Sequence, residues 1–133
     1  MIEHTTRIRV RYADTDQMGF AYYARYLEWF EVGRTEMLRA LGLPYAEIEK
    51  QEIALPVLEV SCKYRKPALY DQLLRVVSRL QERPRAKFRI DYEIFDEGDQ
   101  LLTEGFTLHT FINAEGRPVR PPQVFMQKVN ELF

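Results

Sequence analysis

The sequence is poor in cysteine, histidine and serine, and each shortage removes a class of protein. The one cysteine, Cys62, cannot close an internal disulfide, so a disulfide-stapled fold is excluded and a reducing compartment is permitted. The two histidines, His4 and His109, lie far apart in the chain, which argues against a zinc site. Neither Ser61 nor Ser78 stands in a Gly-x-Ser-x-Gly turn, so a serine hydrolase of that type is disfavoured.

Long apolar runs and a large net charge are also missing. No stretch approaches the ~20 apolar residues that a membrane span requires, and the opening Met-Ile-Glu-His-Thr-Thr-Arg lacks the apolar core of a secretory signal. The formal net charge is -1, which gives no reason to expect a nucleic-acid partner. We therefore expect a cytoplasmic protein without a membrane span.

The chain of 133 residues suits a single domain spanning residues 1–133, which buries ~65–70% of its unfolded surface without a disulfide or metal. Ile8, Val10 and Tyr12 alternate with arginines, which predicts a strand with one buried face. The period then becomes helical, and Gly42 with Pro44 provides a C-terminal stop. The apolar stripe of this long helix consists of Leu27, Phe30, Met37, Leu38 and Leu41.

Four further strands are predicted after the helix. They cover residues 54–64, 72–80, 88–94 and 101–112, and a short terminal helix follows with an apolar face of Val124, Phe125, Val129 and Leu132. The turn at residues 96–100 reads as a hairpin, with Gly98 available for a positive φ. Gly105 within a strand indicates a bulge or a close backbone approach, and Gly33 within the helix calls for close packing on the sheet. This order of elements favours an α+β fold, an antiparallel sheet with one helix on a single face.

The loop between the first strand and the helix carries the most chemistry. It contains two carboxylates, Asp14 and Asp16, and Gly19. Asp16 lies a few residues before a helix N-terminus, where free backbone N–H groups favour developing negative charge. The alternative is a structural turn, because aspartates commonly bond nearby backbone N–H groups in turns and caps, and we expect Asp14 to have that structural role.

Three segments resemble those of the 4-hydroxybenzoyl-CoA thioesterase family of hotdog proteins, which includes the Tol-Pal-associated acyl-CoA thioesterases. The segments are Tyr12-x-Asp14-Thr15-Asp16-x-x-Gly19-x-x-Tyr22 followed by Tyr26, Glu31 and Arg34, then Tyr64-x-x-Pro67-Ala68-x-x-Asp71, and finally Arg117-Pro118-x-x-x-Pro121. The resemblance implies the hotdog fold, in which an antiparallel β-sheet wraps around one long central helix. It also implies a homodimer or homotetramer with active sites between subunits.

The same resemblance implies an enzyme, an acyl-CoA thioesterase that releases a carboxylic acid and free coenzyme A. Matching the motif places the catalytic carboxylate on Asp16, as general base or as nucleophile, and the oxyanion donor on the backbone N–H of Tyr23. The Tol-Pal-associated members usually have a histidine where this chain has Tyr23. Coenzyme A is part of the substrate, and neither a metal nor another cofactor is expected.

The substrate-binding residues are expected around the loop and at one basic corner. Gly19, Tyr22 and Glu31 are candidates near Asp16, although the more ordinary role for Glu31 is a surface pair with Arg34. For the coenzyme A phosphates, the candidates at the corner are Arg83, Arg85 and Lys87. The resemblance places them at about the basic nucleotide-binding segment of the family, and they suit phosphate by charge and geometry. Their alternative role is to protect an edge strand, and a second basic group is Lys63, Arg65 and Lys66.

Two other functions remain open from the sequence. One is a non-catalytic module that binds an acyl thioester or a protein. The other is a hotdog hydratase or dehydratase, which would need a histidine near the carboxylate. His109 is the histidine that folding would have to bring there.

Overall fold

The computed structural model describes all residues 1–133. The elements in chain order are β1 (Ile2–Arg9), the 3-10 turn η1 (Tyr12–Asp14), α1 (Arg25–Ala40), α2 (Tyr45–Glu49), β2 (Val57–Tyr64), β3 (Leu73–Leu80), β4 (Lys87–Phe95), β5 (Leu101–Ile112), β6 (Pro118–Val119) and α3 (Gln123–Asn130). The strands form one antiparallel sheet in the order β1-β3-β4-β5-β2, and β6 pairs with the end of β5.

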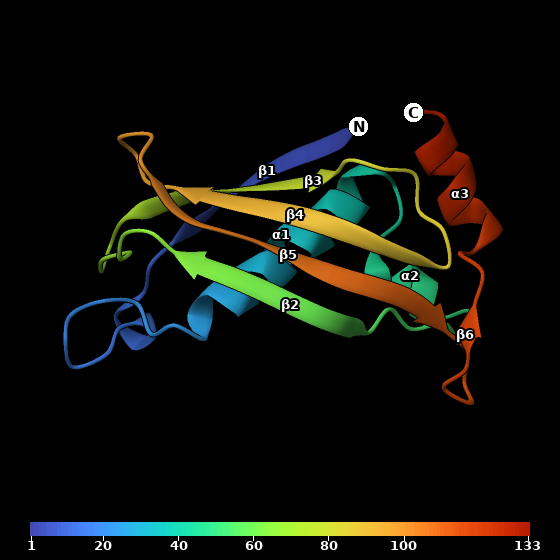
Figure 1. The fold of residues 1–133 in the computed structure, drawn as a ribbon, viewed down its shortest axis with the longest axis horizontal. Coiled ribbons are helices and arrows are strands. Elements are labelled where there is room, and N and C mark those ends of the chain that lie inside the picture. The colour runs from blue at the N-terminus through green and yellow to red at the C-terminus, as the bar shows by residue number, and fades with distance from the viewer.

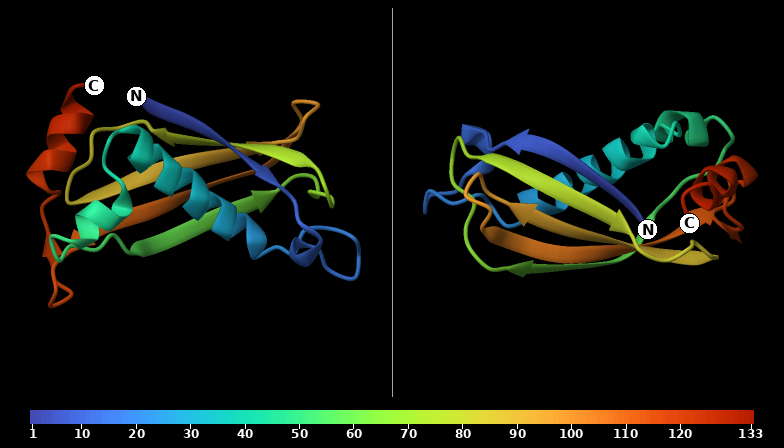
Figure 2. Two further views of the ribbon diagram at one scale, coloured as in Figure 1. Left: turned by 180° about the vertical axis from the view of Figure 1, so that it is seen from behind. Right: turned by 90° about the horizontal axis from the view of Figure 1, so that it is seen from above.

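The helix α1 lies across one face of this sheet, and the sheet curves around it (Figures 1 and 2). The small helix α2 follows α1 after a turn at residues 41–44, and α3 lies at the end of the sheet where β5 ends (Figure 1). The expected α+β arrangement of an antiparallel sheet around one central helix is therefore confirmed. No helix combines the length and the apolar character that crossing a membrane requires.

The core lies between α1 and the inward face of the sheet. The alternation in β4 is confirmed, since Phe88, Ile90, Tyr92 and Ile94 are all buried. Phe30 of α1 stacks on the ring of Tyr92 with centroids 4.4 Å apart. This stacking fixes the height of the helix over the central strands.

Two glycines permit this close packing. A Cβ at Gly33 of α1 would lie 2.5 Å from Ser78 Oγ and 2.8 Å from Val76 Cγ1, so the helix rests directly on β3. A Cβ at Gly105 would lie 2.1 Å from the carbonyl oxygen of Ser61 on β2. Gly105 thus marks the close backbone approach that the sequence indicated, and it pairs in register with Cys62.

Two side chains that the sequence placed on buried faces are exposed. Tyr12 is 78% exposed because the strand ends at Arg9 and the chain turns away from the sheet. Leu27 is 37% exposed because one sheet covers only a narrow arc of α1, and Leu27 lies at its margin. The buried side chains of α1 are Tyr26, Trp29, Phe30, Met37 and Leu38.

Other details of the sequence prediction were also wrong or incomplete. The positive φ in the β4–β5 hairpin belongs to Asp99, not Gly98, because an aspartate tolerates the left-handed region. In α3, Phe125 and Val129 are buried and Val124 is exposed, because only one side of this short helix is covered, and Leu132 lies exposed beyond the end of the helix. The helix α2 and the two-residue strand β6 were not predicted.

The strand β2 is an edge of the sheet and pairs on one side only, with β5. Its burial pattern has no fully buried residue. Val57, Leu58 and Val60 are 44%, 48% and 43% exposed. An unpaired edge with apolar side chains is a template for pairing with another chain.

Candidate active site

The loop after β1 is anchored by the buried carboxylate of Asp14. Its Oδ2 accepts the backbone N–H of Arg11 at 2.8 Å, and its Oδ1 accepts Nη2 of the same arginine at 2.9 Å. Nε of Arg25, at the start of α1, lies 3.7 Å from Oδ1. Burial opposes the ionised form, but the hydrogen bonds and charges of Arg11, with the charge of Arg25, outweigh it and lower the pKa of Asp14. Asp14 thus connects β1 to α1, in keeping with its expected structural role.

Asp16 opens a tight turn that presents its carboxylate. Its N–H donates to Phe20 O at 2.8 Å, and Gly19 N–H donates to Asp16 O at 3.0 Å. Gly19 has a φ of 81°, a conformation that glycine adopts without strain. Oδ1 of Asp16 accepts the N–H groups of Met18 at 2.9 Å and Phe20 at 3.3 Å. Oδ2 accepts no hydrogen bond within the chain, so one carboxylate oxygen remains free for chemistry.

The turn that leads into α1 leaves a backbone donor free. Tyr22 N–H donates to Asp14 O at 2.7 Å, and Arg25 N–H donates to Tyr22 O at 2.9 Å. Because a trans peptide points its C=O and N–H in opposite directions, the bond from Arg25 turns the Tyr23 N–H away from the helix. The Tyr23 N–H has no acceptor within the chain. It is one of the unsatisfied donors of a helix N-terminus, where partial positive charge collects.

A pocket of about 310 Å³ joins these two groups. Asp16 and Tyr23 both line it, and its opposite wall comes from Tyr64 at the end of β2 and the residues that follow. Tyr26 lies between the walls, and its hydroxyl accepts the N–H of Ala68 at 3.0 Å. The structure therefore brings together the two residues that the sequence assigned to catalysis.

The other predicted residues near the loop have different positions. Gly19 shapes the Asp16 turn but does not line the pocket. Tyr22 is 45% exposed and packs against Tyr23, with ring centroids 4.6 Å apart. Glu31 lines a separate pocket of about 290 Å³ together with Arg34. These two residues form no ion pair, since Arg34 donates instead to the hydroxyl of Tyr92 at 3.1 Å.

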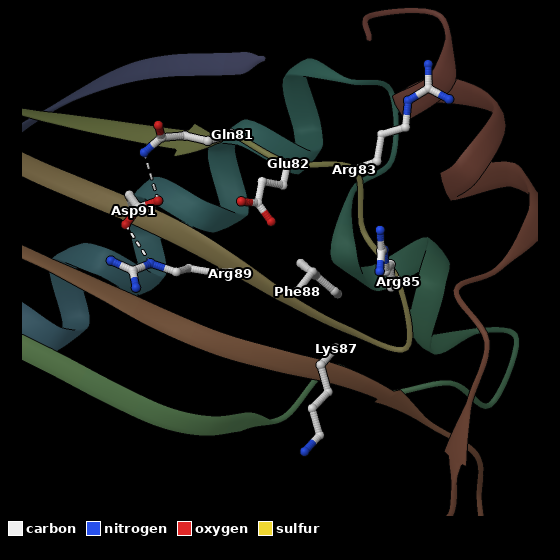
Figure 3. Close-up of a pocket in the computed structure, with 8 residues that line it drawn as sticks. All are labelled: Gln81, Glu82, Arg83, Arg85, Lys87, Phe88, Arg89 and Asp91. Carbon is white, nitrogen blue, oxygen red and sulfur yellow. Dashed lines mark hydrogen bonds and ion pairs between the residues drawn. The ribbon is translucent and has the colours of Figure 1, made fainter.

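The basic corner of Arg83, Arg85 and Lys87 lies at the other end of the sheet. β3 starts beside the Asp16 loop and runs away from it for 8 residues, or about 26 Å. The corner follows β3 and borders a pocket of about 460 Å³. Figure 3 shows Arg83 and Lys87 pointing in opposite directions from the chain. Within one chain this corner is remote from Asp16.

The second basic group lies closer to the candidate site. Arg65 and Lys66 line the same pocket as Asp16. Arg65 is held by an ion pair with Glu104, whereas Lys66 has no ion-pair partner. Sequence reasoning ranked this group below the corner because it could not show that the segment after β2 folds against the Asp16 turn. The sequence signal for this position was the Tyr64-x-x-Pro67 segment of the family resemblance, because this segment includes Arg65 and Lys66 and forms a wall of the pocket.

A buried chain of hydrogen bonds surrounds His109. Its Nδ1 lies 3.2 Å from Pro56 O, and its Nε2 lies 2.7 Å from Thr107 Oγ1. A carbonyl only accepts, so Nδ1 carries the proton and Thr107 donates to Nε2. The hydroxyl of Tyr92 lies 2.7 Å from Thr107 Oγ1 and donates to it, while Arg34 donates to Tyr92. Burial, with the charge of Arg34, lowers the pKa of His109 to about 4.

His109 is not a neighbour of Asp16 in this chain. It pairs with Val57 at the start of β2, whereas the pocket borders Tyr64 at the end of that strand. The two positions are seven residue steps apart along β2, which is about 23 Å. The carboxylate and imidazole that a hydratase would combine are thus far apart within one chain.

Comparisons with known proteins agree with the fold and the motif. Residues 10–129 match the family described as Thioesterase-like superfamily. The chain is 34% identical over 119 residues to YneP of Bacillus subtilis (strain 168), named provisionally as an acyl-CoA thioesterase, with 89% of this chain and 86% of that protein covered.

Solved structures give the same result. DHNA-CoA thioesterase from Staphylococcus aureus superposes with a TM-score of 0.94 at 33% identity, covering 99% of this chain and 91% of that one. Slr0204, a 1,4-dihydroxy-2-naphthoyl-CoA thioesterase from Synechocystis, has a TM-score of 0.89 at 27% identity, with 98% and 97% covered. The chain therefore belongs to the thioesterase-like superfamily and has its hotdog fold.

Proposed function

We propose that this protein is an acyl-CoA thioesterase in which the carboxylate of Asp16 and the backbone N–H of Tyr23 act on the same thioester. The observation that carries the proposal is that the free Oδ2 of Asp16 and the unpartnered Tyr23 N–H belong to residues lining one pocket. Membership of the superfamily and the activities named for its relatives support the same reaction class.

The chemistry needs a base or nucleophile and an oxyanion donor. With Asp16 as general base, water loses a proton to Oδ2 and attacks the thioester carbonyl. The carbonyl oxygen becomes an oxyanion, which accepts the Tyr23 N–H. The intermediate then expels the coenzyme A thiolate, which takes the proton back from Asp16. With Asp16 as nucleophile, Oδ2 attacks first, the thiolate leaves, and water hydrolyses the resulting anhydride.

Coenzyme A would enter across the basic rim of this pocket. Lys66 has no ion-pair partner and lines the pocket with Asp16, so it suits an anionic group of the substrate. The corner of Arg83, Arg85 and Lys87 would serve the same Asp16 only from a second copy of the chain. The exposed apolar edge of β2 supports such a homo-oligomer. The proposed reaction uses the groups of the chain itself and no metal or further cofactor.

The test is thiol release from short, medium, long and aromatic acyl-CoAs by the wild type and by Asp16→Asn. The asparagine Oδ1 can still accept the N–H groups of Met18 and Phe20, so the turn and the melting temperature should persist. We expect kcat to fall by about 10²-fold or more, because the base or nucleophile is lost. The control is Glu115→Gln, which removes an exposed carboxylate from the turn before β6 and should leave kcat unchanged.

Full activity in folded Asp16→Asn would show the assigned mechanism to be wrong. If the wild type binds acyl-CoAs but releases no thiol from any of them, the protein is a binding module instead. Addition of water to an enoyl thioester would identify a hydratase, with a base other than His109 of the same chain.

A further inference from the structure

We infer that Tyr64 is a positioning residue for the oxyanion donor: its hydroxyl holds the peptide after Tyr23 so that the Tyr23 N–H keeps its direction during the reaction. The inference rests on the proposed function. It concerns a side chain on β2, in a different segment from the Asp16 motif.

The hydroxyl of Tyr64 donates to the carbonyl oxygen of Tyr23 at 2.9 Å. This bond spans 41 residues of sequence and joins the last residue of β2 to the turn before α1. The ring of Tyr64 packs edge-on against Tyr26, with centroids 5.0 Å apart. Tyr26 is itself buried and bonded to the N–H of Ala68. The side chain of Tyr64 is therefore held in place by its packing on Tyr26 while its hydroxyl donates to Tyr23.

The two peptides that flank the Cα of Tyr23 are held from different sides. Arg25 N–H holds Tyr22 O, which fixes the peptide that carries the Tyr23 N–H. Tyr64 holds Tyr23 O, which fixes the next peptide. Together the two bonds restrain φ and ψ of Tyr23, the only two soft backbone torsions at this residue. An oxyanion donor stabilises a transition state most when it already points at the developing charge, because no free energy is then spent on reorganisation during the reaction.

Tyr64 is suited to a constant hydrogen bond. Partial burial and the neighbouring Cys62 raise the pKa of its hydroxyl above the ordinary value for tyrosine. The hydroxyl thus remains protonated and keeps donating at neutral and mildly alkaline pH. A phenylalanine at this position would retain the ring contact with Tyr26 and remove only the donor.

The experiment compares Tyr64→Phe with wild type in acyl-CoA hydrolysis. Losing one hydrogen bond of about 1 kcal/mol should lower kcat about fivefold, with KM within about twofold of wild type and the shape of the pH profile unchanged. The matched control is Tyr45→Phe, since the Tyr45 hydroxyl also bonds to the backbone, accepting Leu55 N–H at 3.0 Å, but outside the Asp16 pocket. Its kcat should equal that of the wild type.

A second readout needs no turnover. In amide NMR spectra, Tyr64→Phe should shift or broaden the Tyr23 and Ala24 signals, and Tyr45→Phe should leave them in place. If the Asp16-dependent activity and the Tyr23 amide signal both survive in Tyr64→Phe, this inference is wrong while the proposed function stands. The inference would also be overturned if the plot of kcat against pH for Tyr64→Phe lacked the decrease at alkaline pH that wild type shows, because Tyr64 would then act as a proton donor in the reaction. If the wild type hydrolyses no acyl-CoA, the proposed function fails. An altered Tyr23 signal in Tyr64→Phe would then show that Tyr64 holds the Tyr23 peptide, and the role of this contact in hydrolysis would be wrong.

Discussion

The neutral His109 should make the stability of this protein fall steeply in mild acid. In the folded chain, Nε2 of His109 accepts a hydrogen bond from the Thr107 hydroxyl. If Nε2 were protonated, its N–H would face the O–H of Thr107, and the hydrogen bond would be lost. The pKa of His109 is lowered to about 4, against an ordinary 6.5 in the unfolded chain. Between these values the unfolded chain binds a proton that the folded chain does not. The free energy of unfolding therefore decreases as the pH falls from 6.5 to 4, and its full value is present above pH 6.5.

The size of this loss follows from the difference in pKa. A shift from 6.5 to about 4 at 1.36 kcal/mol per unit corresponds to about 3 kcal/mol. Of this, about 2 kcal/mol is lost between pH 7 and pH 4.5. That is a large share of the roughly 5–15 kcal/mol by which folded proteins are stable.

The assay is urea unfolding at a series of pH values and one protein concentration, followed by the fluorescence of Trp29, which is buried. The comparison variant is His109→Gln, whose amide can donate to Pro56 and accept from Thr107 but does not titrate. Carboxylates contribute equally to both proteins, so the difference between the two curves isolates the histidine. Parallel curves from pH 7 to pH 4.5 would refute the reasoning, because a histidine that titrates normally in the folded chain would add no pH dependence.

Two further variants test the packing and the loop. Gly105→Ala should lower the free energy of unfolding in urea by about 3 kcal/mol, because the new Cβ would lie 2.1 Å from Ser61 O and strands β2 and β5 would have to separate. The control is Gly98→Ala, whose Cβ meets only Asp96 Oδ1 at 3.4 Å. Equal stability of the two variants would contradict the close contact at Gly105. Asp14→Asn should cost about 1–2 kcal/mol in the same assay. An amide oxygen in place of Oδ2 still accepts hydrogen bonds from the backbone N–H and Nε of Arg11, but the amide NH₂ in place of Oδ1 cannot accept one from Nη2, and the negative charge is lost. A variant as stable as wild type would show that the loop does not depend on this anchor.

The sheet was predictable where side chains alternate strictly between two environments. β4 has that pattern from Lys87 to Ile94, since its inward residues are apolar and its outward residues charged. The pattern failed at Tyr12, because alternation along a sequence does not reveal where the chain leaves the sheet. It missed α2, because a helix of 5 residues is too short to show a period. Pro44, which was interpreted as a stop for α1, is also the N-cap residue of this helix.

The candidate site was predictable only in part, because its walls come from distant segments. Asp16 and Tyr23 stand close in sequence, and the motif identified them together. Tyr64 and Lys66 follow them by more than forty residues, and only the folded sheet brings the end of β2 to the same pocket. The basic corner was favoured from its charge and from its place near the basic nucleotide-binding segment of the family that the sequence resembles, and neither shows how far a residue lies from Asp16 in the folded chain.

The connection of the Asp16 turn to the segment after β2 links catalysis to the order of folding. Ala21 N–H donates to Ala68 O, and Phe20 bridges Leu69, so the turn is completed by residues almost fifty positions away. Such non-local contacts form late and slowly compared with helices and hairpins. A refolding chain should therefore regain its helix signal before it regains any turnover, and the return of activity reports that the whole sheet has closed.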